Sequence, residues 1–131
     1  MSTITAIRQI DVGPGMVFVG NRRVLTWPVV DEDRLPRDLS GEAFMFGILK
    51  SQNDLVPILV KSSQGLDPKV SLSGANHNLI SVIFEEDDFW DGSAFINIEE
   101  PGRHWYTLKD STAGIVIAYG ELWITWAAAR G

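Results

Sequence analysis

The sequence contains no cysteine in its 131 residues. The chain therefore has no thiol for a disulfide framework, a thiolate-bound metal, an iron–sulfur cluster or a catalytic cysteine. Histidine is nearly as scarce, with only His77 and His104. A Ser-His-Asp triad needs a histidine paired with a nucleophile, and neither histidine stands in a recognisable pattern of that kind. His77 lies in a turn-like Gly-Ala-Asn-His-Asn stretch and His104 alternates into a strand, so we expect no catalysis at either.

Basic residues are in the minority, with 11 Lys and Arg against 17 Asp and Glu and a formal net charge of −6. An acidic surface repels phosphate, and the bases cluster nowhere beyond Arg22–Arg23, so nucleic acid is not an expected partner. No apolar run approaches the roughly 20 residues that span a bilayer. The first residues lack the apolar segment of a signal peptide. We therefore expect a cytoplasmically made protein with no signal peptide and no membrane contact.

Two acidic runs are candidates for a hard cation such as calcium: Asp31-Glu32-Asp33 and Glu85-Glu86-Asp87-Asp88. Neither has the alternating ligands and fixed glycine of an EF-hand loop. A hairpin turn explains the first run, and the start of a helical turn explains the second, because carboxylates suit the free N–H groups there. Gly13-Pro14-Gly15 is too short for a phosphate loop, and its proline lacks an N–H. We expect no metal ion and no cofactor.

What the sequence does contain is a series of short strand-like segments separated by turn residues. The segments are Val24–Val30, Glu42–Lys50, Leu55–Lys61, Val70–Ser73, Leu79–Phe84, Ala94–Ile98, Arg103–Lys109 and Ile115–Trp126. Val70–Ser73 and Leu79–Phe84 form either two strands or one interrupted strand, which gives about seven in all. This spacing predicts an all-β sandwich or barrel, and prolines inside two segments favour a sandwich with edges. Glu85–Trp90 is predicted to form one helical turn, with Phe89 and Trp90 plugging the space between sheets.

The last segment, Ile115–Trp126, is apolar on both of its faces, although a one-sided strand should alternate apolar with polar residues. One face carries Val116, Ala118, Gly120, Leu122, Ile124 and Trp126. The other carries Ile115, Ile117, Tyr119, Glu121, Trp123 and Thr125. The expected core already has Leu25, Phe44, Phe46, Ile80 and Leu108. The second face is therefore predicted to contact something other than this core.

Five tryptophans are many for one small core, since each buries roughly 150–250 Å². We assign Trp27 and Trp126 to the core, and Trp105 and Trp123 to the opposite face of the last hairpin. Exposed tryptophans are enriched at protein interfaces and also stack on sugar rings. A crowded core is the remaining explanation.

Residues 1–19 are interpreted as an N-terminal arm that precedes the domain at 20–131. Short apolar pieces flank its Gly-Pro-Gly break. The arm either pairs with a neighbouring sheet or subunit, or supplies the first strand of the domain's own sheet. Its candidate interface residues are Ile4, Ile7, Ile10, Val17 and Phe18.

The run GNRRVLTWPVVDEDRLPRDLSGEAFMFGILK resembles the opening of a family of small phage tail and baseplate β-sandwich domains. Those domains have a first strand, an Asp-x-Asp-Gly-x-Pro-x-Asp-Leu-(Ser/Thr)-Gly turn and a second strand. Here the turn is Asp31–Gly41, with Arg34 in place of the usual glycine. PGRHWYTLKD and AYGEL also resemble that family's Gly-x-Tyr-Tyr-x-x-Leu and closing strands. The similarity extends from Gly20 to Ala127.

The resemblance implies an Ig-like antiparallel β-sandwich of about seven strands in a phage or prophage virion. It would be a non-enzymatic tail, baseplate or head-decoration adaptor, assembled with itself, as a trimer or hexamer, and with other virion proteins. Trp105, Tyr119 and Trp123, with the arm, would form the interface. The alternative is a carbohydrate-binding module that reads a host glycan through the same tryptophans. A bacterial Ig-like domain of prophage origin is a third interpretation.

Overall fold

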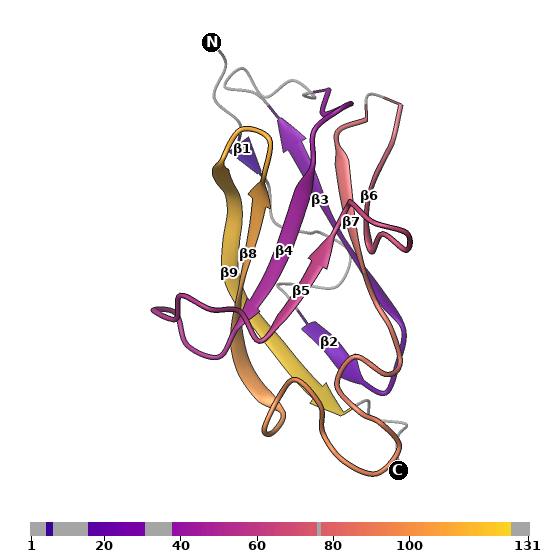
Figure 1. Cartoon of the computed structure of the whole chain (residues 1–131), viewed down its shortest axis with the longest axis vertical. Coiled ribbons are helices and arrows are strands. Elements are labelled where there is room, and N and C mark those ends of the chain that lie inside the picture. The colour runs from indigo at the N-terminus through magenta and orange to yellow at the C-terminus, as the bar shows by residue number, and fades with distance from the viewer. Residues whose placement is uncertain (1–4, 7–15, 31–37, 76, 127–131) are drawn as a thin grey trace.

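The computed structural model describes residues 5–6, 16–30, 38–75 and 77–126, and the side chains of residues 5, 6, 30 and 126 are outside this description. All regular elements are strands (Figure 1). They are β1 (Thr5–Ala6), β2 (Met16–Val19), β3 (Arg23–Val30), β4 (Phe44–Leu49), β5 (Leu59–Ser62), β6 (Val70–Ser73), β7 (Leu79–Phe84), β8 (Gly102–Asp110) and β9 (Ile115–Trp126).

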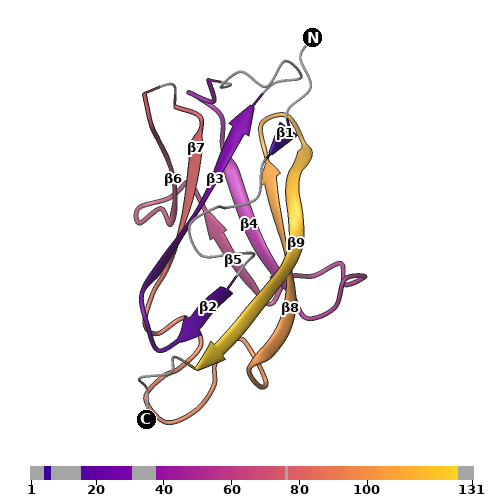
Figure 2. The ribbon, with the colours of Figure 1, turned by 180° about the vertical axis from the view of Figure 1, so that it is seen from behind.

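The strands form two sheets, in the orders β1-β3-β7-β6 and β2-β9-β8-β4-β5. In the lettering of immunoglobulin domains, β1 is strand A, and β3 to β9 are strands B, C, C′, D, E, F and G in turn. The first sheet is then A-B-E-D and the second contains G-F-C-C′, which is the order of immunoglobulin domains. Every pairing is antiparallel except that of β2 with β9, which is parallel. Figure 2 shows β2 beside β9 from behind. The predicted Ig-like β-sandwich is confirmed.

The core lies between the sheets and is centred on three aromatic rings. Trp27 from β3 lies 5.6 Å from Phe46 of β4 and 5.4 Å from Tyr106 of β8, measured between ring centroids. The indole Nε1 of Trp27 donates to the Tyr106 hydroxyl at 3.3 Å. In antibody domains a disulfide joins strands B and F, the equivalents of β3 and β8. In this cysteine-free chain, an aromatic pair links the same two strands.

The N-terminal boundary differs from the sequence prediction. Met16–Val19, assigned to the arm, is β2 of the five-stranded sheet and pairs with Trp123–Trp126 of β9. Val17 and Val19 are fully buried in the core. Met16–Val19 is therefore a strand of the sandwich's own five-stranded sheet.

The predicted helical turn after β7 is wrong. Residues 85–88 form a β-turn in which the Asp88 N–H donates to the Glu85 carbonyl at 3.2 Å. The Asp88 carboxylate accepts the Glu85 N–H at 2.8 Å, which closes the turn from the other side. The described residues contain no helix.

The aromatic residues after this turn do reach the interior. Phe89 is buried and stacks against Phe84 at 6.3 Å, and Trp90 is half-buried against Phe95. The predicted strand Ala94–Ile98 is reduced to one isolated bridge between Trp90 and Phe95.

A β-bulge interrupts the alternation of β9. Leu108 pairs with Ala118 while Lys109 pairs with Val116, so Ile117 is an extra residue with no partner of its own. Such an insertion reverses which side chains face inward. Ile117 is buried and Val116 is exposed, the reverse of the predicted assignment for these two residues. Beyond the bulge, Leu122 and Ile124 are buried as predicted.

Candidate interaction surface

The outer face of the four-stranded sheet mixes hydroxyl groups with half-buried apolar side chains. Thr26, Ser81 and Ser71 form one row across β3, β7 and β6. The hydroxyls of Thr26 and Ser81 lie 3.1 Å apart and share a hydrogen bond. The rows on either side hold Val24 with Ile83 and Pro28 with Leu79, and all four side chains are half-buried.

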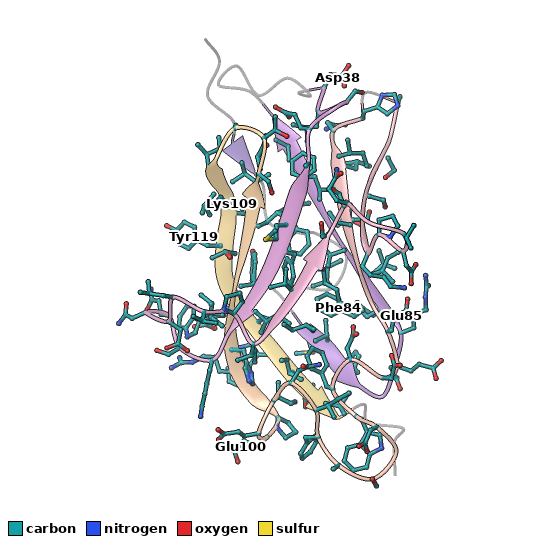
Figure 3. The ribbon with its side chains drawn as sticks, in the orientation of Figure 1. Asp38, Phe84, Glu85, Glu100, Lys109 and Tyr119 are labelled. Atoms are coloured by element: carbon teal, nitrogen blue, oxygen red, sulfur yellow. The ribbon has the colours of Figure 1, made fainter. Side chains whose placement is uncertain are left out.

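The outer face of the five-stranded sheet is different, because large apolar side chains gather on it. We call this surface the apolar face. Its apolar members are Met16, Phe18, Met45, Val60, Trp105, Val116, Tyr119 and Trp123. Tyr119 is 72% exposed and Trp123 is 43% exposed. Figure 3 shows Tyr119 and Lys109 projecting from this side of the sandwich. Contiguous apolar surface of this kind marks an interaction site.

Two charged residues hold the aromatic rings of the apolar face in place. The Glu121 carboxylate lies 3.6 Å from Nη1 of Arg103 and accepts the indole N–H of Trp123 at 3.3 Å. The Arg103 guanidinium lies 5.5 Å from the Trp105 ring centroid, in a cation–π contact. These contacts favour one orientation of the Trp105 and Trp123 rings, and a side chain held in its bound orientation loses less entropy on binding.

The loop between β4 and β5 extends the apolar face sideways (Figure 1). At its root, a Cβ on Gly47 would come within 3.3 Å of the Pro57 Cβ, so glycine lets Pro57 pack on the outer surface of β4. Next to Pro57 stand Val56 and Leu55, and Leu55 is 96% exposed. Sequence reasoning assigned these two residues to a strand and missed their exposure.

The predicted interface residues are only partly brought together. Trp105, Tyr119, Trp123 and Phe18 share the apolar face, with Trp105 and Phe18 half-buried. Val17 is a correction: it points into the core, because alternation along β2 puts its neighbour Phe18 outside. Ile4, Ile7 and Ile10 lie outside the described residues. Met45 and Val60 were missed, although each alternates with core residues in its own strand.

The two histidines lie in different environments in the described part of the chain. His104 is buried with Nδ1 3.0 Å from the Gly102 carbonyl, and His77 sits exposed in a turn with φ of 51°. No group of three or more potential metal ligands occurs among the described residues. The run Asp31–Asp33 lies outside them. The described residues also include no helix long and apolar enough to cross a membrane.

The acidic run 85–88 is used for ion pairs. Asp88 binds Lys61, with 2.6 Å between Oδ2 and Nζ. Glu85 and Asp67 each lie 3.1 Å from the Lys69 ammonium. The hydrogen bonds that this ammonium donates, first to Glu85 and then to Asp67, raise the pKa of Lys69. Glu86 and Asp87 are exposed.

A polar cleft opens at one end of the apolar face. Lys50, Glu99, Glu100, Pro101, Gly102, Arg103 and His104 line it. Lys50 and Glu99 form an exposed ion pair at 3.1 Å across it. Arg103 belongs to both surfaces, so the cleft is continuous with the Trp105 and Trp123 rings.

Comparisons with known proteins give fold-level likenesses only. No family model matches the chain, and no curated protein matches it. Among solved structures, a mutant beta-glucosidase from Listeria innocua in complex with laminaribiose aligns with 94% of this chain at 12% identity and a TM-score of 0.46. The beta-glucosidase from Listeria innocua in complex with glucose aligns with 95% at 12% identity and a TM-score of 0.43. The chain spans 16% of each of these glucosidase chains.

A third similar structure is that of Dpr1 IG1 bound to DIP-eta IG1. It aligns with 97% of this chain and 94% of that chain, at 9% identity and a TM-score of 0.33. All three TM-scores lie below 0.5, so these likenesses carry no argument about family or function.

Proposed function

We propose that this chain is a non-enzymatic structural protein of a bacteriophage particle, an adaptor of the tail, baseplate or head decoration, that acts by protein–protein assembly. The observation that carries the assembly role is the set of exposed aromatic and aliphatic side chains on the outer face of the five-stranded sheet. Tyr119 is 72% exposed, Trp123 43% and Met45 42%, whereas the described apolar side chains on the outer face of the four-stranded sheet are all half-buried. The resemblance of residues 20–127 to phage β-sandwich domains supports the virion as the setting.

The apolar face has the composition of an interface core. Tryptophan, tyrosine, methionine and arginine are enriched in such cores, and all four occur here. Trp123 lies between Arg103 of β8 and Met16 of β2. A copy of this chain, and other virion proteins, are the partners that this proposal assigns to the face.

Trp123→Asp is expected to dissociate the assembly while leaving the fold intact. Truncation of a hot-spot tryptophan costs about 2 kcal/mol or more of binding free energy, so association should weaken by about 30-fold or more. Light scattering gives the mass, and far-ultraviolet circular dichroism gives the fold. Ser71→Asp, which puts the same charge on the outer face of the four-stranded sheet, should keep the wild-type mass. An unchanged mass for Trp123→Asp would exclude this face as the interface.

A specific observation favours a second function, the binding of a host glycan. Trp123 and Tyr119 are exposed, and the polar cleft adjoining Arg103 offers carboxylates and cations that could hydrogen-bond sugar hydroxyls. In this case the domain would work as a monomer, with the rings of the apolar face in water.

Tryptophan fluorescence separates the two functions. For a glycan-binding protein, host polysaccharide should quench the emission, unrelated sugars should not, and Trp123→Ala should lose most of the response. Absence of quenching by purified host polysaccharide, together with a stable oligomeric mass, would leave assembly as the function.

A further inference from the structure

A second patch, on the opposite side of the molecule from the apolar face, is complementary to it in charge. Asp67 and Glu85 share Lys69, so the loop after β5 and the turn after β7 meet at one place. Glu86 and Asp87 follow Glu85 and are exposed. Leu66 precedes Asp67 and is fully exposed. We call this set, Leu66, Asp67, Glu85, Glu86 and Asp87, the acidic edge.

The charges of the acidic edge do not cancel. Its four carboxylates face two cations, Lys69 and Arg22, the latter 3.9 Å from Glu85. The apolar face has the opposite balance, with Arg103 and Lys109 against Glu121. Lys109 is exposed and forms no ion pair with another described residue. Among the strand residues of the apolar face, these three side chains leave one positive charge in a chain whose net charge is −6.

The two patches also match in polarity. The apolar face presents the rings of Trp105 and Trp123 beside the Arg103 guanidinium. The acidic edge presents the exposed Leu66 side chain beside carboxylates. Figure 3 places Lys109 and Tyr119 on one side of the sandwich and Glu85 on the other. The acidic edge of one copy therefore cannot contact the apolar face of the same copy.

We propose that copies of this chain assemble head to tail, with the acidic edge of one copy seated on the apolar face of the next. This inference rests on the proposed self-assembly and specifies its geometry. A contact between two different patches is heterologous, so it closes into a ring or extends as a fibre, whereas a contact of one patch with itself stops at a dimer. A face-to-face dimer would instead bring together two surfaces whose strand residues each carry an excess positive charge.

Two variants that each disable one patch test this geometry. Trp123→Asp disables the apolar face, and the double variant Leu66→Lys/Asp87→Lys disables the acidic edge at two exposed positions. Each variant alone is expected to be monomeric by native mass spectrometry. Mixed in equal amounts, they should form a heterodimer of two protomers and nothing larger, because one intact face and one intact edge remain. Ser71→Lys, which puts the same positive charge on the outer face of the four-stranded sheet, should assemble like the wild type.

The outcomes separate the geometry from the proposed function. If Leu66→Lys/Asp87→Lys keeps the wild-type mass while Trp123→Asp is monomeric, the chain self-assembles through the apolar face alone and the head-to-tail contact is wrong. Folded variants that remain monomers in the mixture also overturn it. A wild-type chain that is monomeric at every concentration overturns both the head-to-tail contact and the proposed self-assembly.

Discussion

Trp27→Ala is expected to destabilise the fold by about 3–5 kcal/mol, as large-to-small changes at buried aromatic positions do. The free energy of unfolding of a natural domain is roughly 5–15 kcal/mol in total, so the variant should unfold at low urea concentrations or fail to fold. The physical reason is that Trp27 lies between the two sheets, where it is fully buried against Phe46 and Tyr106 of the opposite sheet. Urea unfolding followed by circular dichroism, at one fixed protomer concentration, measures the loss.

A double-mutant cycle separates the hydrogen bond from the packing. Tyr106→Phe leaves the indole N–H of Trp27 buried without its acceptor, which costs about 1–3 kcal/mol. Trp27→Phe removes the donor and leaves the Tyr106 hydroxyl unpaired. The double variant should cost less than the sum of the two. Strict additivity would show that the hydrogen bond between Trp27 and Tyr106 contributes nothing to stability. As a control, Trp123→Ala changes a surface residue and should cost less than about 1 kcal/mol in stability.

The core could be predicted from the sequence because it follows from local alternation. Leu79–Phe84 was predicted with the bounds that the structure shows, and Leu25, Phe44, Phe46, Ile80 and Leu108 are all buried. In each case one strand's own period of two decides which side chains point inward. Trp27 was assigned to the core for the same reason.

The features that the sequence did not predict depend on distant segments. The burial of Ile117 is set by the register of β9 against β8, and the parallel pairing of Met16–Val19 with β9 joins residues about a hundred positions apart. The turn at Glu85–Asp88 contains an acidic run that suits a helix start equally well. In the structure, the Asp88 carboxylate of this turn forms an ion pair with Lys61, a residue of another strand.

The apolar face was predicted in part. Tyr119 and Trp123 followed from the excess of apolar residues on both faces of one strand, a signal contained in Ile115–Trp126 itself. Leu55 and Val56 could not be found in this way, because an apolar pair before a strand has the same pattern whether it is buried or exposed. Only the packing of Pro57 on Gly47 turns that loop outward.

Lys61→Ala is expected to cost about 3–5 kcal/mol, which is large for a lysine. Lys61 and Asp88 are 6% and 12% exposed and lie 2.6 Å apart, and the Lys61 ammonium also lies 5.8 Å from the Phe84 ring centroid. This pair joins β5 of one sheet to the turn after β7 of the other, at the open edge of the sandwich. Removing the cation leaves a buried carboxylate without its partner, and that penalty dominates the loss.

Two comparisons make the Lys61 prediction specific. Lys50→Ala breaks the Lys50–Glu99 ion pair, which is similar in length but exposed at both ends, and should cost less than about 1 kcal/mol. Lys61→Met combined with Asp88→Asn should be more stable than Lys61→Met alone, because a neutral amide still accepts the Glu85 N–H without a buried charge. Urea midpoints at one protomer concentration decide both comparisons. Equal losses for Lys61→Ala and Lys50→Ala would mean that water reaches the Lys61–Asp88 pair, and that the two sheets are held together by the aromatic centre and not by this edge.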